Sequence, residues 1–292
     1  MVRTLAGFGA SVKRATNDGR TPVFMAAQDG HAEAVKALAE LGACVKTPDN
    51  DDRTPVSIAA QNGHTSMVRL LAEFGACVER PMDDGATPVH MAAANGLTET
   101  VRVLAELGAS VKTPDNEGCT PVFIAAVNGH TEVARVLAEL GACVKTPDAK
   151  GCTPVFFAAS NGHTEMVRVL AALGACVKTT ARNDGCKPVY IAAQNGHAET
   201  VRVLVVELGA SVNTLINDGA TPVFAAATTG HAETLQVLVE LGADVKTTDN
   251  AGNAPAHYAA DYDHPKFIRL LARLKADMTS PNNFGWSPLR VG

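Results

Sequence analysis

The stretch Gly118-Cys-Thr-Pro-Val-Phe-Ile-Ala-Ala-Val-Asn-Gly-His-Thr-Glu-Val-Ala-Arg-Val-Leu-Ala-Glu-Leu-Gly-Ala142 decides the fold, because its pattern recurs along the whole chain. Thr120 before Pro121 predicts a helix start, since the hydroxyl can accept from an unpaired backbone N–H and proline suits the first helical position. Gly129 predicts the end of that helix, because glycine tolerates the positive φ of a tight exit. A second helix, ending at Gly141, is indicated by apolar residues three, four and seven positions apart, namely Val133, Val136, Leu137 and Leu140.

The same signals repeat with a nearly constant period. Thr-Pro, or its equivalent, stands at 21, 54, 87, 120, 153, 187, 221, 254 and 287, with spacings of 33 or 34 residues. Each predicted helix is shorter than the roughly 12–15 residues at which an isolated helix becomes marginally stable in water, so stacking must stabilise it. A fixed period of this size predicts a solenoid. We expect one array over 1–292, with a partial repeat at 1–19, eight repeats at 20–285 and the start of a truncated repeat at 286–292.

Thr-Pro-Val-His-Met-Ala-Ala-Ala-Asn-Gly at 87–96, together with the Gly-His turns and the Leu-Gly-Ala exits, resembles the ankyrin repeat. The resemblance covers essentially the whole chain. It implies an all-α fold with short β-hairpin-like loops, built as an ankyrin-repeat solenoid of stacked helix–turn–helix units of 33–34 residues. It also implies a concave face, formed by hairpin tips and inner helices, that binds a protein partner.

Composition argues against several other classes of protein. The net charge is −5 and only 4% of the residues are aromatic, whereas nucleic-acid binding favours basic patches and stacking rings. No run of 18 or more apolar residues is present, so we expect no membrane span, and the N-terminus has no long apolar signal region. Because the histidines and cysteines follow the repeat instead of converging, and no glycine-rich loop follows a strand, we expect no enzyme activity, no metal site and no cofactor.

The seven cysteines also follow the repeat. They stand after Gly-Ala or just before the Thr-Pro position, at Cys44, Cys77, Cys143, Cys176, Cys119, Cys152 and Cys186. Equivalent sites one helix-packing distance apart, roughly 8–10 Å, lie beyond the reach of a disulfide or of a shared zinc ion. Free thiols are therefore predicted, and with them a reducing, cytoplasmic location.

Several positions depart from the family pattern. The tetrapeptide histidine remains only at His90 and His257, and elsewhere the position holds Phe24, Ser57, Phe123, Phe156, Tyr190 and Phe224. A packed aromatic row is the preferred interpretation, and a ligand-binding box is the alternative. The histidines that follow glycine at the inter-helix turn are expected to be structural, as they are in the family.

Charged residues are expected to form weak pairs. Lysines are followed three residues later by an acid, as in Lys46–Asp49 and Lys112–Asp115, and could alternatively form a basic stripe. On the second helices, i,i+3 pairs such as Glu99–Arg102 and Glu199–Arg202 should contribute about 0.2–0.5 kcal/mol each.

Two insertions interrupt the period. One lengthens the loop 179–185, and the other adds a residue to the helical stretch Val-Leu-Val-Val-Glu-Leu at 203–208. The second predicts a π-bulge or a displaced helix exit near Val205–Leu208. The eighth repeat has Ala254 instead of the capping threonine and an aspartate, Asp263, instead of the turn glycine, so it is expected to fray first.

The resemblance places candidate partner contacts at the hairpin tips and on the exposed side of the inner helices. These residues are Asn17, Asp18, Arg20, Gln28, Asn50, Asp51, Arg53, Gln61, Asp83, Asp84, Asn95, Asn116, Glu117, Val127, Lys150, Ser160, Asn183, Asp184, Gln194, Asn217, Asp218, Thr228, Asn250, Asn253 and Tyr262. Asn and Asp at the tips also suit tight turns, so turn chemistry competes with recognition as their role.

The predicted function is that of a protein–protein interaction module. The alternative is a structural spacer or consensus-like scaffold without a specific partner. Weak self-association through the terminal half-repeats, at Leu5/Phe8 and Trp286/Leu289, is a further possibility.

Overall fold

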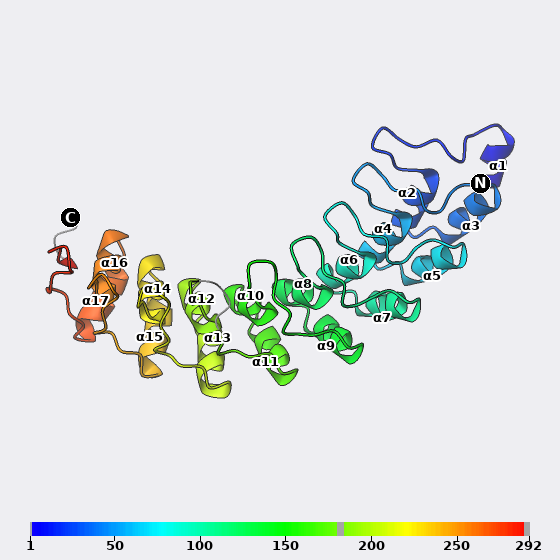
Figure 1. Cartoon of the computed structure of the whole chain (residues 1–292). Helices are drawn as coiled ribbons and strands as arrows, with labels where there is room; N and C mark the ends of the chain where they lie inside the picture. The colour runs from blue at the N-terminus through cyan, green and yellow to red at the C-terminus, as the bar shows by residue number, and fades with distance from the viewer. Residues whose placement is uncertain (1, 180–183, 289–292) are drawn as a thin grey trace. The chain divides into compact units, whose positions relative to one another are not determined.

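The computed structural model describes residues 2–179 and 184–288, and the chain divides into two compact units, residues 1–149 (unit 1) and 150–292 (unit 2). Unit 1 contains α1 (Val2–Gly7), α2 (Pro22–Gln28), α3 (Ala32–Glu40), α4 (Pro55–Gln61), α5 (Thr65–Glu73), α6 (Pro88–Ala94), α7 (Thr98–Glu106), α8 (Pro121–Asn128) and α9 (Thr131–Glu139) (Figure 1). Unit 2 contains α10 (Pro154–Ser160), α11 (Thr164–Ala172), α12 (Pro188–Gln194), α13 (Ala198–Arg202), the π-helix η1 (Val203–Glu207), α14 (Pro222–Thr229), α15 (Ala232–Glu240), α16 (Pro255–Asp261) and α17 (Pro265–Arg273). The described residues contain no strand, so the predicted all-helical class is confirmed.

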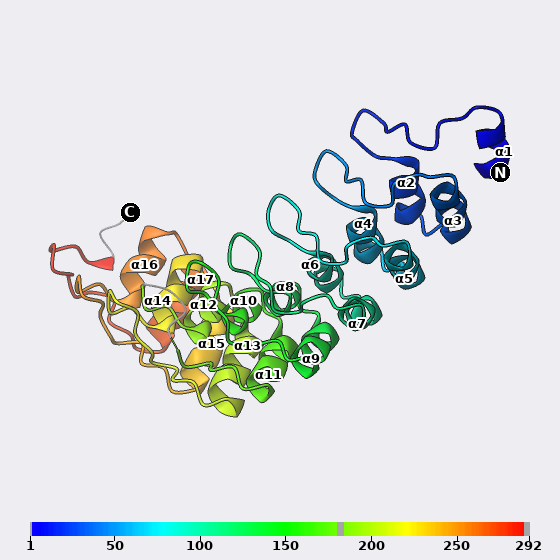
Figure 2. The same cartoon turned by 45° about the vertical axis from the view of Figure 1, so that its right-hand side comes forward.

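Within each unit the helices stack as pairs in two rows (Figures 1 and 2). In unit 1 the first helices α2, α4, α6 and α8 pack against one another, and the second helices α3, α5, α7 and α9 form the other row. In unit 2 the first helices α10, α12, α14 and α16 are likewise neighbours. Paired alanines such as Ala59 and Ala60 are completely buried, and their small side chains allow this close approach. The predicted solenoid of stacked helix pairs is therefore confirmed.

The helix ends follow from the residues that predicted them. The Thr120 hydroxyl accepts from the backbone N–H of Phe123, and α8 ends at Gly129 with φ of 75°. In the eighth repeat Ala254 has no hydroxyl, and its own N–H donates to His257 Nδ1 at 3.0 Å. Asp263 there adopts φ of 54°, in the left-handed region that glycine occupies in the other repeats. The missing cap and the left-handed aspartate were both expected from the sequence. Early fraying of this repeat stays a prediction.

The tetrapeptide position forms a packed row, as preferred from the sequence. The rings of Phe24, Phe123, Phe156 and Phe224 are all buried. In unit 2, Tyr190 packs against a cluster of buried residues that includes Phe156. Burial on this scale leaves no open ring face for a ligand, so the ligand-binding box is not supported.

The extra residue at 203–208 is absorbed by a π-helix. Val203–Glu207 is a π-helix, and the N–H of Leu208 donates to the Val203 carbonyl at 3.1 Å, five residues back. The predicted π-bulge is thus confirmed. The other insertion falls largely on residues 180–183, which lie outside the described residues.

Ion pairs on the second helices differ from those predicted. Arg102 pairs with Glu139 at 3.1 Å and Arg202 with Glu240 at 2.9 Å, each in the next repeat, in place of the i,i+3 partner. Arg168 does have an i,i+3 partner, Glu165 at 3.4 Å, and it also reaches Glu207 at 2.9 Å. The stacked neighbour brings a glutamate within reach of the long arginine side chain, which sequence spacing within one helix does not reveal.

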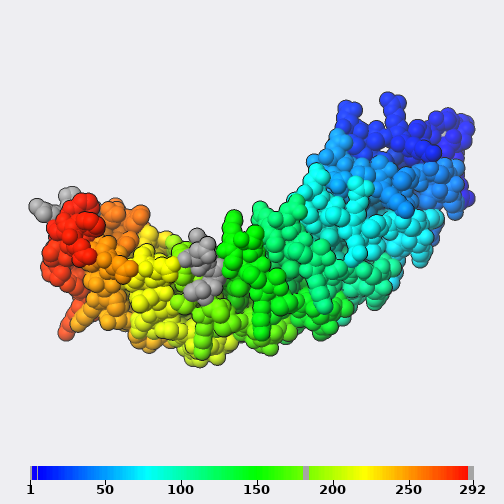
Figure 3. All heavy atoms as spheres, viewed as in Figure 1, coloured from blue at the N-terminus to red at the C-terminus, as the bar shows by residue number. Residues whose placement is uncertain are grey.

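Hairpin-like loops precede the first helices, and in unit 1 they extend from the same side of the helix rows (Figures 1 and 2). The N–H of Asp49 donates to the Arg53 carbonyl at 2.9 Å, and the N–H of Asp115 donates to the Cys119 carbonyl at 2.9 Å. The N-terminal loop, in dark blue, projects from the surface of unit 1 in Figure 3.

Candidate functional site

The predicted contact residues lie on accessible parts of the structure. All of them except Asn183, which falls outside the described residues, are exposed or half-buried. They belong to the hairpin tips and to the ends of the first helices, which are separate sets with different neighbours.

The asparagines of the tips face the preceding hairpin. The Nδ2 of Asn50 donates to the Asn17 carbonyl at 3.1 Å, and that of Asn116 donates to the Asp83 carbonyl at 2.9 Å. Gly19 has φ of 80°, and a Cβ there would lie 2.4 Å from Asn50 Oδ1. Glycine and asparagine therefore form a clamp between hairpins. We find the tip asparagines engaged in structure, which agrees with the turn chemistry weighed from the sequence.

The tip acids are also used locally. The Oδ1 of Asp115 accepts from the N–H groups of Glu117 and Cys119, at 2.9 and 2.8 Å. The Oδ1 of Asp249 accepts in the same way from Ala251 and Asn253. The predicted lysine–aspartate pairs are wrong at these positions, because the carboxylate is turned toward the N–H groups of its own loop.

Two of the candidate contacts predicted at the ends of first helices, Asn95 and Tyr262, are one residue out of step with the equivalent residues of the other repeats. A period of 33 residues places Ala94 level with Gln61 and Asp261 level with Thr228, whereas Asn95 and Tyr262 were predicted. Both are the residues that follow the ends of α6 and α16. Asp261 is therefore a surface residue that sequence reasoning missed, although the spacing of the repeats identifies it.

Histidines at the inter-helix turns connect adjacent repeats. The Nε2 of His64 lies 2.9 Å from the Gln28 carbonyl, and that of His130 lies 3.0 Å from the Ala94 carbonyl. In unit 2, His197 contacts the Ser160 carbonyl in the same manner. These rings have a structural role, as expected from the sequence.

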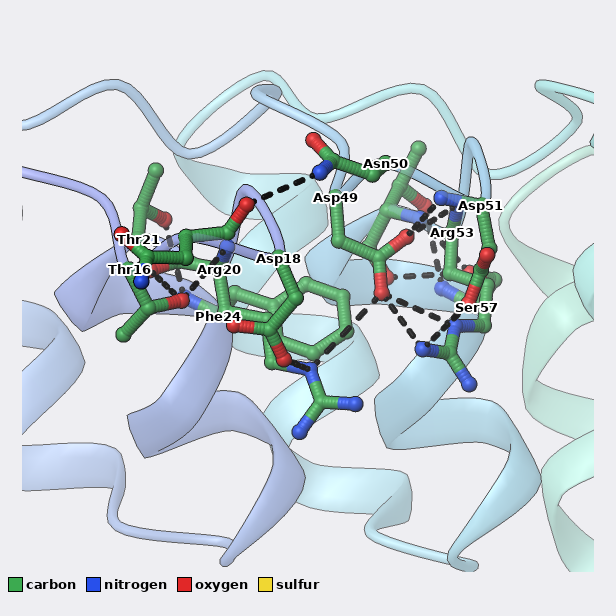
Figure 4. Close-up of polar contacts among 12 residues, drawn as sticks. Thr16, Asp18, Arg20, Thr21, Phe24, Asp49, Asn50, Asp51, Arg53 and Ser57 are labelled. Carbon is green, nitrogen blue, oxygen red and sulfur yellow. Dashed lines mark hydrogen bonds and ion pairs between the residues drawn. The ribbon is translucent and has the colours of Figure 1, made fainter.

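Two arginines distinguish the first hairpins of unit 1 from the others. Arg20 and Arg53 are one repeat apart, and Asp49 lies between their guanidinium groups (Figure 4). Arg53 donates to Asp49 Oδ2 from Nε at 2.9 Å and from Nη2 at 2.7 Å. Arg20 Nε lies 3.1 Å from Asp18 and 3.9 Å from Asp49. We call Arg20, Asp49 and Arg53 the arginine cluster.

The Asp49 side chain is only 1% exposed, and it holds Arg53 through two hydrogen bonds. It attracts Arg20 more weakly, because Arg20 Nε lies closer to Asp18 and makes no hydrogen bond. The hydrogen bond from Asp49 raises the pKa of the Arg53 guanidinium above the usual value. The Asp49 Oδ1 also accepts from the N–H groups of Asp51 and Arg53, at 3.2 and 2.9 Å. Removing this carboxylate would therefore disturb the hairpin itself.

The arginine cluster keeps donors for an external ligand. Arg20 Nη1 and Nη2 and Arg53 Nη1 make no hydrogen bond within the described part of the chain. Figure 4 shows the Nη atoms of Arg20 turned away from Asp49. The Arg20 guanidinium carbon lies 6.0 Å from the ring centroid of Phe24, a packed residue that restricts the arginine further.

The corresponding positions in unit 2 are different. Asn253 replaces the arginine and donates to Asp249 Oδ2 at 3.0 Å, and Tyr258 donates to the same oxygen at 2.8 Å. One repeat later Trp286 occupies the arginine position, with Phe284 two residues before it. Both aromatic side chains are exposed.

Metal binding and membrane insertion find no support within residues 2–179 and 184–288. This part of the chain holds no group of three or more His, Cys, Asp or Glu side chains arranged to bind a metal. None of its helices has the length and apolar character needed to cross a bilayer. All seven cysteines are free, with Cys119, Cys152 and Cys186 buried, which confirms the predicted free thiols.

Comparisons with known proteins agree with the geometry. The model of the family described as ankyrin repeats (3 copies) matches residues 1–82, 75–148, 143–216 and 208–282. The crystal structure of the human ASB11 ankyrin repeat domain is similar, with a TM-score of 0.67 and 27% sequence identity, over 78% of this chain and 100% of that chain. None of the curated proteins compared with the chain matches it.

Proposed function

Because this chain belongs to the ankyrin repeat family, whose repeats are generally protein-interaction modules, we propose that it binds a protein partner and that the arginine cluster anchors that partner in unit 1. The family fold is typically a non-enzymatic binding scaffold. We also infer a reducing, cytoplasmic location, supported by the seven free thiols.

One observation carries the proposal. Arg20 and Arg53 are half-buried, paired with Asp18 and Asp49 respectively, and still present unused N–H donors. Arginine is enriched among the residues that dominate interface energies, and a guanidinium already fixed by its neighbours loses less side-chain entropy on binding. The natural occupant is a partner segment that presents carbonyl or carboxylate oxygens to these donors.

The remaining predicted contacts contribute to this surface in a smaller way. Gln28 and Gln61 are the last residues of α2 and α4, in the same repeats as Arg20 and Arg53, and both are half-buried. The tip asparagines, in contrast, are hydrogen-bonded to neighbouring hairpins. We therefore expect substitutions of the helix-end residues to affect binding more than substitutions of Asn50 do. The latter should act through stability.

The test compares proteins captured from cell extract by the wild-type chain and by two variants. Arg20→Gln removes the unused donors, while Arg53 continues to neutralise Asp49. Arg69→Gln is the matched control, because Arg69 is an exposed arginine on α5 that pairs with Glu106. We expect a specific partner to be lost with Arg20→Gln and retained with Arg69→Gln. Equal capture by both variants would contradict the assignment.

Arg53→Ala is a poor test, since it would leave a buried carboxylate without its main partner and disturb the fold. Arg53→Lys keeps the charge beside Asp49 and removes the fork of donors. It should weaken capture while the melting temperature changes little, which separates binding from folding.

A spacer without a specific partner is the second candidate function. It is favoured by the tip asparagines, which are turned toward the preceding hairpins and are not offered outward. This function predicts that no protein is captured specifically by the wild-type chain, so the same experiment distinguishes the two.

A further inference from the structure

A cavity of ≈ 230 Å³ opens on unit 2 between α16 and the hairpin that follows α17. Tyr258 and Asp261 contribute from the helix, and Phe284 and Trp286 from the hairpin. The last two residues are 72% and 62% exposed, with ring centroids 6.4 Å apart and planes inclined by 49°. Large aromatic side chains exposed to this degree next to a hollow are typical of a recognition surface. We call these four residues the aromatic pocket.

The backbone that carries the two rings is fixed. The Oδ1 of Asn282 accepts from the N–H of Phe284 at 2.9 Å and from the N–H of Trp286 at 3.0 Å. The carbonyl of Trp286 lies 2.9 Å from His257 Nε2, and Asn282 Nδ2 donates to Asn253 at 2.7 Å. The rings are therefore presented by an ordered turn, which lowers the entropy lost when a ligand binds.

The charge of the pocket is negative. Within the described residues, no hydrogen bond or ion pair engages the carboxylate of Asp261, which is exposed at the rim. Behind the wall, Asp249 accepts from the Tyr258 hydroxyl at 2.8 Å. Among residues 2–179 and 184–288, no lysine or arginine lines the cavity. Both ring nitrogens of His257 are engaged within the fold, because Nδ1 accepts from the Ala254 N–H and Nε2 contacts the Trp286 carbonyl.

We propose that the aromatic pocket binds the guanidinium group of an arginine carried by a protein partner. A guanidinium is planar and stacks on aromatic faces, as cations do in general, and its N–H fork matches a carboxylate such as that of Asp261. A neutral side chain gains only the stacking, and an acidic one is repelled. The inference rests on the proposed function only in that a protein carries the arginine, and it concerns unit 2 alone.

The chain offers its own reporter, because Trp286 is its only tryptophan. The single indole N–H signal in a ¹H–¹⁵N spectrum can be followed during titration with the peptide acetyl-Gly-Arg-Gly-amide. We expect a saturable shift, and at least a roughly fivefold weaker affinity for the same peptide with citrulline, which keeps the shape and loses the charge. Asp261→Asn should weaken arginine binding about fivefold as well.

The matched control is Asp263→Asn, which removes a carboxylate on the neighbouring turn that does not line the cavity. It should change the affinity by less than about twofold. Equal binding of citrulline and arginine, equal effects of the two aspartate variants, or no shift up to about 10 mM peptide would overturn the proposal. A shift of the indole signal on dilution of the protein alone would assign the pocket to a second copy of the chain and overturn it too. Because the titration uses a peptide and not the captured partner, its failure leaves the Arg20-dependent capture experiment unaffected.

Discussion

At the scale of single residues, position within the repeat decides which side chains are free to act. Thr, Pro, Gly and Ala of the repeat, and the tip asparagines, are engaged in capping and stacking, as the sequence indicated. The residue just before the Thr-Pro position varies, and it holds Arg20, Arg53 and Trp286. The sequence placed the first two among the candidate partner contacts. It could not show that Asp49 lies between both arginines, because the approach of Arg20 to Asp49 joins two loops a repeat apart.

His90 gives a residue-scale prediction about pH. Burial lowers the pKa of this histidine, whose Nδ1 accepts from the Thr87 N–H at 3.1 Å and whose Nε2 donates to the Cys119 carbonyl at 3.0 Å. Since the folded-state pKa lies below the unfolded one, the stabilisation is complete above the unfolded pKa of about 6.5. It is lost at up to about 1.4 kcal/mol per pH unit as pH falls toward the folded pKa.

The variant His90→Phe tests this, because phenylalanine occupies the same position in other repeats, as at Phe24. We expect the variant to lose roughly 1 kcal/mol less unfolding free energy than the wild type between pH 7 and pH 5, measured by urea denaturation. Other histidines are common to both proteins, so their contributions cancel. Identical pH dependence in the two would show that His90 is not responsible.

At the scale of elements, the helix starts, helix ends and the π-helix were predictable because each depends on local residue chemistry. The ladder of arginine–glutamate pairs was not, since it depends on the distance between stacked helices. The residue separation within each arginine–glutamate pair nevertheless shows how neighbouring repeats are aligned. Arg102 reaches Glu139 over 37 residues, and Arg168 reaches Glu207 over 39, the difference of two being the two inserted residues. Both insertions are therefore absorbed before the next glutamate.

Deleting Val206 should convert η1 into a regular α-helix. Val206 is 63% exposed, so little packing is lost, and the leucine N–H would then reach the Val203 carbonyl four residues back. We expect the unfolding free energy to rise by roughly 0.5 kcal/mol and the amide of the leucine to exchange more slowly with solvent. The same deletion in a helix without an insertion, such as removal of Ala171 from α11, should destabilise unit 2. Loss of stability in both cases would contradict this account.

The hairpin clamp gives another element-scale prediction. At Ala149 the clamp asparagine is missing, and only the backbone N–H donates to the preceding hairpin, at the Glu117 carbonyl, 2.8 Å away. Ala149→Asn should supply a side-chain donor to the carbonyl of Asn116, 33 residues back, and stabilise unit 1 by about 0.5–1.5 kcal/mol. Ala149→Asp, which cannot donate when ionised, is the control. A thermal melt in which both variants behave alike would rule out the clamp as the cause.

At the scale of the whole molecule, the period was enough to predict a solenoid, and the motif at 87–96 with the Gly-His turns and Leu-Gly-Ala exits carried the resemblance to the family. The sequence could not reveal the division into units 1–149 and 150–292, because no change of composition marks it. It also missed the aromatic pocket, although a solitary tryptophan at a position otherwise held by Arg, Ala, Cys or Asn was a usable signal. A binding surface depends on which residues that depart from the repeat pattern become neighbours in space, and the period of the repeat does not show this.

The seven thiols provide a measurement for both units. Four cysteines are exposed and three are buried, one in unit 1 and two in unit 2. Hydrogen bonding lowers the pKa of Cys44, where the Thr47 hydroxyl is the main cause, and of Cys143, where it is the Lys145 N–H. In the native protein, four thiols should therefore react quickly with a thiol reagent and three slowly, by a factor of at least about 100.

Mass spectrometry of the labelled peptides would show which unit opens first in mild denaturant, since Cys119 reports on unit 1 and Cys152 on unit 2. Uniform labelling of all seven thiols without denaturant would be incompatible with the burial described above.

The π-helix has a consequence for the gene as well as for the fold. One additional codon in a repeat would be expected to shift every later contact by a residue, yet here the shift is confined to a single helical turn and Glu207 still meets Arg168. A duplicated array of this kind can thus accumulate in-frame insertions without losing the alignment between neighbouring copies. An irregular repeat length in such a gene is consequently a poor indicator that the array has lost its fold. The inserted codon can then change further under selection.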